Sequence, residues 1–520
     1  RLFVRVLFRD RVHSSLFHGR CWTSHTYARL HLAFLLTTMA PPQITAEGAA
    51  YSPPGARGKK RVDASEHKAG STDGKDGALT TTDERLLCTY DTHVFDLTEF
   101  QDLHPGGKTI IELNKGRDIT HLYDSYHWGQ RLTQRAKNPK YRIKEVDAKV
   151  ECVPEALSAD THTDQSIIRL QKHLIKLGYS SKNLKIPWYG VLYFALGLSL
   201  YAFCGYQWFI HPTTLGKCVY GALFGQLAFY VCGFLQHEGC HTALSNHMWI
   251  NKVGAYLLMP WGHPGVWLYK HVIQHHPNTN TTMDGDIQFE GPILRHHKAN
   301  PLTALHKIQS YTINFLSMFV SLSHPMNFDI WGQYPLTTAM YLSSFLAVFG
   351  TQMYLTGSFL LGFLPIASFG LVFVFVTQLS HIQEECIDQT KVLTKPPNFT
   401  KHQISACFDY NHNSFLISAF SIFLNFQTYH HLVPGISHFH FLFNKQLVAH
   451  IDQYLADNNE KVNVHQFVDV VKGYFGYLAK LQSEIDWEHV RERAGLVIND
   501  EHGSPSRWNS KYDIYIYLRT

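Results

Sequence analysis

The sequence predicts a mainly α-helical protein that crosses a membrane four times and carries a small α+β domain ahead of its membrane part. Three observations predict this fold: four long uncharged apolar runs, a stretch of globular pattern before them, and histidine clusters that follow the apolar runs. The chain has 520 residues, of which 45% are hydrophobic and only 17% are charged. Its net charge of +5 is not gathered into a basic stripe, so nucleic acid is excluded as an expected partner.

Composition divides the chain into five parts. The first part is rich in Pro, Gly, Ser and Lys and is expected to be a disordered arm, in which Met39 is a candidate start and residues 1–38 are a candidate untranslated segment. The parts are the arm (1–83), a globular domain (84–150), a linker (151–186), a membrane domain (187–445) and a cytosolic C-terminal tail (446–520).

Four apolar runs match the length of roughly 20 residues that a membrane-spanning helix needs. They are residues 188–210, 214–236, 336–356 and 359–380. The short connections within each pair predict two hairpins, so both chain ends and the central loop share one side. Lysines on that side make it the cytosolic one: Lys182, Lys185, Lys252 and Lys270. Residues 248–262 and 305–325 are expected to be helices in the membrane interface. Buried helices of a large soluble enzyme are the alternative, but uncharged runs of this length favour a membrane.

Histidine clusters follow the apolar runs and, in the expected topology, all lie on the cytosolic side. Their members are His237 and His241; His271, His275 and His276; His381; and Gln427, His430 and His431. Residues four apart share one face of a helix. Eight histidines exceed the three or four of one zinc site and suit two metal ions with open positions. Imidazole ligands without thiolate suit iron, so we expect a di-iron centre that activates O2.

The stretch "HEGCH" at residues 237–241 also fits the H-E-x-x-H pattern of zinc proteases, with Glu238 as the general base. That alternative leaves the other histidine clusters unexplained. Gly239 also weakens the helix that the protease motif requires.

Residues 91–127 suggest a haem site. His104 is followed by Pro105, Gly106 and Gly107, then by a short apolar helix and a second helix that ends at His127. Glycines let the backbone approach a flat ligand closely. His104 and His127 are therefore expected to occupy both axial positions of one haem, so that its iron passes electrons and does not bind oxygen.

At these residues the segment 84–150 resembles cytochrome b5, and residues 187–445 resemble the membrane fatty acid desaturases. The two together, with Gln427 at the first position of the third histidine box, resemble the cytochrome b5-fused front-end desaturases. "HEGCH" departs from the commoner His-Asp form of the first box, which leaves both ligands intact. The resemblance also assigns a positioning role to Asp284 and Asp286.

The resemblance implies a polytopic helical desaturase with a histidine-rich cytosolic cap. It would use O2 to insert a double bond between an existing double bond and the carboxyl end of a polyunsaturated fatty acyl chain. The implied cofactors are haem b and two non-haem iron ions, the substrate is lipid-linked or CoA-linked, and the reductant is NADH through cytochrome b5 reductase. The implied location is the endoplasmic reticulum membrane, with both termini cytosolic. The eight histidines of the clusters are the implied iron ligands, and Gln427 ligates or shapes the site.

Three other functions stay open on the sequence. A sphingolipid long-chain-base desaturase and a lipid hydroxylase would use the same scaffold. An electron-carrying membrane cytochrome with an inactive second domain is the third, and the complete histidine set argues against it.

Overall fold

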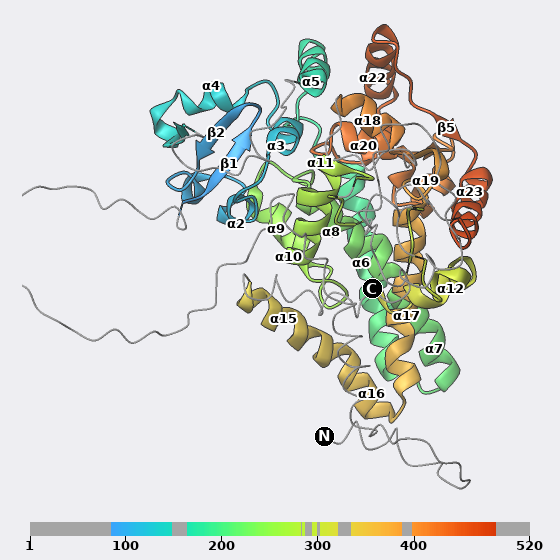
Figure 1. Cartoon of the computed structure of the whole chain (residues 1–520). Coiled ribbons are helices and arrows are strands. Elements are labelled where there is room, and N and C mark those ends of the chain that lie inside the picture. The colour runs from blue at the N-terminus through green and yellow to red at the C-terminus, as the bar shows by residue number, and fades with distance from the viewer. Residues whose placement is uncertain are drawn as a thin grey trace, which may run out of the picture. The chain divides into compact units, whose positions relative to one another are not determined.

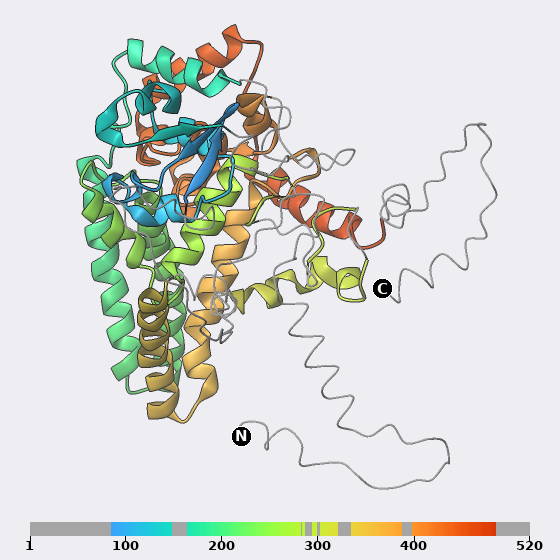
Figure 2. The same cartoon turned by 60° about the vertical axis from the view of Figure 1, so that its left-hand side comes forward.

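The structure is a computed structural model that describes residues 85–147, 164–281, 283–286, 294–298, 302–320, 334–386 and 398–484. The expected N-terminal arm lies outside these residues, as do parts of the expected linker and C-terminal tail. The described chain is mainly helical and has a small sheet near its N-terminal side (Figures 1 and 2).

The sheet belongs to a compact α+β unit. Strands β1 (Leu87–Tyr90), β2 (His93–Asp96) and β3 (Lys144–Val146) pair antiparallel in this order. The helices of the unit are η1 (Gln101–Leu103), α2 (Lys108–Glu112), α3 (Thr120–Tyr126), α4 (Leu132–Ala136) and η2 (Pro139–Tyr141). Asp118 forms a turn just before α3, in which its carboxylate accepts the backbone N–H of Thr120 at 2.9 Å. Tyr90, Phe95 and Leu97 are buried in the core of this unit.

Three of the described helices are long and apolar enough to cross a membrane. They are α6 (Trp188–Ile210), the continuous helix formed by α7 (Thr214–Leu227), η4 (Ala228–Gly233) and α8 (Phe234–Cys240), and α17 (Phe359–Leu379). The helix α7 packs against both α6 and α17 (Figures 1 and 2). At its crossing with α17, Gly225 leaves no room for a side chain, since a Cβ there would lie 2.1 Å from the carbonyl oxygen of Pro365.

The fourth expected span differs from these three. Residues 336–356 are helical, in α15 (Pro335–Phe345), η8 (Leu346–Gly350) and α16 (Thr351–Thr356), but they do not meet the same criterion of length and hydropathy. Threonines, serines and Gln352 lower the mean hydropathy of this segment. Gly357, at a φ of 62°, ends the helix and leads into α17.

The remaining elements surround the ends of the apolar helices. Within the expected linker, α5 (Ser166–Lys176) packs against α3, α18 and α22. The others are α9 (Met248–Tyr256), α10 (Pro264–Trp267), η5 (Leu268–His275), α11 (His276–Asn278), η6 (His306–Ile308), α12 (Gln309–Ser317), η9 (Glu384–Cys386), α18 (Phe399–Ser405), α19 (Phe415–Phe420), η10 (Leu424–Phe426), α20 (Gln427–Leu432), α21 (Phe439–Phe443), α22 (Lys445–Asp457) and α23 (Phe467–Lys480). Strands β4 (Asp409–Tyr410) and β5 (Val464–His465) pair in parallel.

Candidate functional site

The α+β unit brings its two predicted haem ligands face to face. The ring centres of His104 and His127 are 6.2 Å apart. Metal–imidazole bonds are about 2 Å long, so two rings on opposite sides of one metal ion would have their centres roughly this far apart. His104 Nδ1 lies 3.2 Å from the carbonyl oxygen of Gly107, and His127 Nδ1 lies 2.9 Å from that of Tyr123. These contacts hold Nδ1 and leave Nε2 available for a metal.

A cavity of about 480 Å³ lies beside these two rings. Most of the side chains with which the α+β unit lines this cavity are apolar, including Leu97, Phe100, Ile111, Ile119, Leu122 and Leu132. Gly106 is required for its shape, because a Cβ there would lie 2.7 Å from Cε1 of His104. Burial lowers the pKa of His127 to about 3, so its ring is neutral and can act as a ligand at physiological pH. His104, Pro105, Gly106 and His127 line the cavity, and the residues fit a haem.

The predicted histidines of the membrane part also come together, in two buried groups that a third, overlapping set of His271, His275 and Asp286 connects. Ligand atoms within each group lie within 4.8 Å of one another. The first group is His237, His241, His271 and His430, and the second is His275, His381 and His431. His276 lies between the groups, with its ring centre 4.4 Å from that of His241 and 4.2 Å from that of His431.

Four segments far apart in the sequence deliver these side chains. The helix α8 carries His237 and is followed directly by His241, while η5 carries His271 and His275. His381 follows the end of α17, and α20 carries Gln427, His430 and His431. Since η5 is a π-helix, its backbone departs from α geometry where it carries two of the histidines, as is frequent at functional sites.

Most of these histidines have a hydrogen-bond partner at Nδ1, the nitrogen that we call the outer one. His271 Nδ1 lies 2.6 Å from Asp286, and His275 Nδ1 lies 2.8 Å from Asp284. Burial alone would raise the pKa of Asp286, but the hydrogen bond and charge of His271 lower it to about 2. His381 Nδ1 contacts the carbonyl oxygen of Ala406 at 3.1 Å. Carboxylate and carbonyl partners of this kind orient metal-binding imidazoles.

Other ring nitrogens in the groups are buried without a hydrogen-bond partner among the described residues. They are Nε2 of His241, Nδ1 of His237, Nδ1 of His276 and both ring nitrogens of His430. A buried polar atom without a partner is costly. These nitrogens therefore fit metal ions, and the absence of thiolate from both groups fits iron.

Gln427 lies within the second group. Its amide nitrogen is 2.9 Å from Nε2 of His381 and 3.1 Å from Nε2 of His431. A half-turn of the amide exchanges its nitrogen and oxygen, so either atom can face this position.

Tyr126 and His438 also lie at the site, but neither residue was predicted from the sequence. The hydroxyl of Tyr126, which precedes the predicted haem ligand His127, hydrogen-bonds Nδ1 of His241. His438, which follows the third histidine motif, is fully buried against the first group, and its Nδ1 lies 2.6 Å from Glu238. The pattern "SHFH" at residues 437–440 marks another histidine near the motif, whereas nothing in the local sequence singles out Tyr126.

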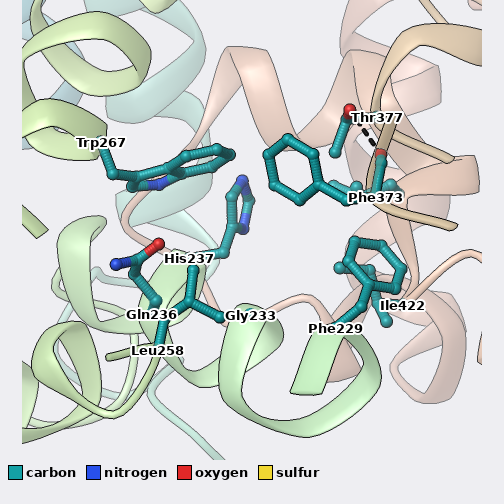
Figure 3. A pocket seen from close by; sticks show the side chains of 10 residues that line it. Phe229, Gly233, Gln236, His237, Leu258, Trp267, Phe373, Thr377 and Ile422 are labelled. Carbon is teal, nitrogen blue, oxygen red and sulfur yellow. Dashed lines mark hydrogen bonds between the residues drawn. The ribbon is translucent and has the colours of Figure 1, made fainter. Parts of the chain in front are cut away.

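An apolar pocket borders the first histidine group. Figure 3 shows the imidazole of His237 beside the rings of Trp267 and Phe373, with Phe229 and Ile422 farther along the pocket. The pocket is narrow, about 10 Å³, so its side chains must move before an acyl chain can enter.

Comparisons with known proteins agree with this geometry. A family model described as fatty acid desaturase matches residues 212–455, and one described as cytochrome b5-like haem/steroid-binding domain matches residues 74–150. An acyl-lipid omega-13 desaturase of Chlamydomonas reinhardtii is 23% identical over 406 residues, which cover 66% of this chain and 83% of that protein.

Two other relatives have similar overlap. A Delta(5) fatty acid desaturase A of Dictyostelium discoideum is 24% identical over 76% of this chain and 90% of its own length. An acyl-lipid (8-3)-desaturase of Physcomitrium patens is 26% identical over 67% of this chain and 78% of its own length. The two matched domains, in this order, and the paired histidine sites show that the chain belongs to the fatty acid desaturases that carry a cytochrome b5-like domain, a family of oxidoreductases.

Proposed function

We propose that the protein is an O2-dependent front-end desaturase. It inserts a double bond between an existing double bond and the carboxyl end of a polyunsaturated fatty acyl chain. Relatives named Delta(5) fatty acid desaturase and acyl-lipid (8-3)-desaturase support this regiochemistry. The position of Gln427 in the second histidine group supports it as well.

The observation that carries the proposal is the pair of buried histidine groups. We assign one iron ion to each group, with His276 between them, and haem b to His104 and His127. Bound iron would supply the oxidising power that an unactivated C–H bond requires. Two hydrogens leave the acyl chain, and O2, two added electrons and two protons complete two molecules of water.

The chain's own residues position this chemistry. Asp284 and Asp286 hold the rings of His275 and His271 in a fixed orientation. The apolar side chains beside His237 exclude water from the path of the acyl chain (Figure 3). A cis double bond bends the acyl chain, and a narrow apolar tunnel discriminates this bend more sharply than it discriminates one methylene.

The electrons reach the iron site from the chain's own haem domain. Tyr126 supports this route, because it precedes His127 in the sequence and hydrogen-bonds His241. NADH–cytochrome b5 reductase supplies electrons to the haem. The protein lies in the endoplasmic reticulum membrane with both termini cytosolic. The five-part domain division of the sequence stays part of this proposal.

Feeding a host that lacks polyunsaturated acids with a panel of fatty acids, then locating double bonds by mass spectrometry, tests the function. We expect new double bonds on the carboxyl side of existing ones in acyl chains of about 18 to 22 carbons. New double bonds in saturated acids alone would refute the front-end assignment. Hydroxylated acyl products, or new double bonds only in sphingoid bases, would replace it by one of the alternatives.

Two sets of variants test the assigned sites. His104→Ala should abolish the low-spin haem spectrum and turnover, whereas His430→Ala should abolish turnover and leave the haem spectrum intact. The exposed His247 gives a matched control, and His247→Ala should change neither. Stoichiometric zinc in an active protein without iron would refute the iron assignment.

A further inference from the structure

His438 lies against the first histidine group although it is outside the four histidine clusters of the sequence. It stands immediately before α21 and its side chain is fully buried. Its ring centre is 4.3 Å from that of His430 and 4.9 Å from that of His237. The predicted ligands have the same spacing, since the ring centres of His237 and His430 are 4.6 Å apart. His438 is therefore a close neighbour of this group, whose ligand atoms within 4.8 Å of one another belong to His237, His241, His271 and His430.

Glu238 holds the outer nitrogen of His438. One carboxylate oxygen of Glu238 lies 2.6 Å from His438 Nδ1 and also accepts the backbone N–H of His438 at 3.1 Å. The same arrangement holds His271 through Asp286 and His275 through Asp284. Histidines that bind a metal almost always donate their other ring N–H to such a partner. His438 thus has the outer contact of a ligand.

The other ring nitrogen of His438, Nε2, has no such partner. Within the described part of the chain, Nε2 of His438 is buried and has no hydrogen-bond partner. When Nδ1 carries the proton that Glu238 accepts, Nε2 presents a lone pair. A structural ion pair alone would leave this buried nitrogen unsatisfied.

We propose that His438 is an additional iron ligand of the first group and that Glu238 is the residue that positions it. This inference rests on the proposed iron site and adds a ligand to it. It also gives the Glu of "HEGCH" a role, because one of its carboxylate oxygens contacts both Nδ1 and the backbone N–H of His438.

The test compares the purified full-length protein with His438→Ala and Glu238→Gln. Iron per chain is measured after dialysis against graded concentrations of a chelator, and the iron environment is measured by Mössbauer spectroscopy. Glu238→Gln should weaken iron retention by about 10–100-fold, as loss of an outer partner does. His438→Ala should weaken it at least as much and should change the spectrum of one of the two iron ions.

His412 provides the matched control. It pairs with Asp409 at 3.0 Å but belongs to neither histidine group. His412→Ala should therefore keep the iron content and the spectrum, and the thermal melt of each variant reports whether it is folded. Iron retention and spectra of His438→Ala equal to those of the unaltered protein would overturn the proposal, as would equal iron loss in His412→Ala.

The same measurements distinguish failure of the proposed function from failure of the His438 assignment. An unaltered protein that contains no iron and makes no desaturated product would refute the iron site itself. An unaltered protein with two iron ions and normal products, in which His438→Ala retains both ions, would refute only the assignment of His438.

Discussion

Replacing Tyr126 by Phe should slow electron transfer from the proposed haem site to the proposed iron site without removing a ligand from either. Tyr126 is the hydrogen-bond partner of Nδ1 of His241, whose Nε2 faces the first histidine group. The substitution deletes one hydroxyl and leaves the ring in place. Loss of an outer partner of a metal-binding histidine typically costs 10–100-fold in affinity or activity. That factor corresponds to about 1.4–2.7 kcal/mol.

The assay is stopped-flow oxidation of the reduced haem in the full-length protein, with O2 and substrate present. We expect the haem oxidation rate and product formation to fall together by about 10–100-fold in Tyr126→Phe, with an unchanged haem spectrum. Tyr269→Phe is the control, since the Tyr269 hydroxyl accepts its hydrogen bond from Arg117, at 2.5 Å, and not from a predicted ligand. Unchanged rates in Tyr126→Phe, or an equal loss in Tyr269→Phe, would refute the reasoning.

Three further predictions concern packing, pH and ligand support. Gly225→Ala should destabilise the protein by about 1–3 kcal/mol, because the new Cβ meets the Pro365 carbonyl, whereas Gly476→Ala, with no atom within 4 Å, should not lower the melting temperature in detergent. Burial raises the pKa of Asp124 to about 7, so the folded domain keeps a proton that the unfolded chain loses above about pH 4. Stability should fall between about pH 4 and 7 and then level off, and Asp124→Asn should flatten this slope in thermal melts followed by haem absorption. Asp284→Asn should lower iron retention about 10–100-fold by weakening the support of His275, and retention equal to that of the unaltered protein would contradict this.

Local patterns in the sequence predicted the parts of the fold that depend on composition over one helix. The apolar run 188–210 coincides with α6, and the histidine pairs at spacing four come from α8 and η5. The run 336–356 is helical, but its hydroxyl side chains keep it outside the set of apolar spans. The sequence pattern thus predicted the helix at 336–356. Whether this helix is apolar enough to cross a membrane depends on small differences in side-chain polarity.

The contacts that the sequence did not predict join distant residues. Glu238 and His438 are 200 positions apart, and Tyr126 and His241 are 115 positions apart. No periodicity relates such pairs, because tertiary packing alone brings them together. A motif search finds ligands that are close in sequence, whereas an outer partner or an isolated ligand is found only when the chain is folded.

The haem cavity has walls from two parts of the chain. Besides the α+β unit, it is lined by Cys240, Asn251, Lys252 and Leu268, which flank the proposed iron-binding segments. A haem that contacts both walls stabilises the arrangement in which the two walls are together. The gain is about 2.7 kcal/mol when the free haem concentration is 100 times its Kd. We therefore expect haem to act as an assembly factor as well as an electron carrier. A cell short of haem would then accumulate chains whose reducing domain is less firmly attached to its acceptor, and would lose desaturation more steeply than it loses haem.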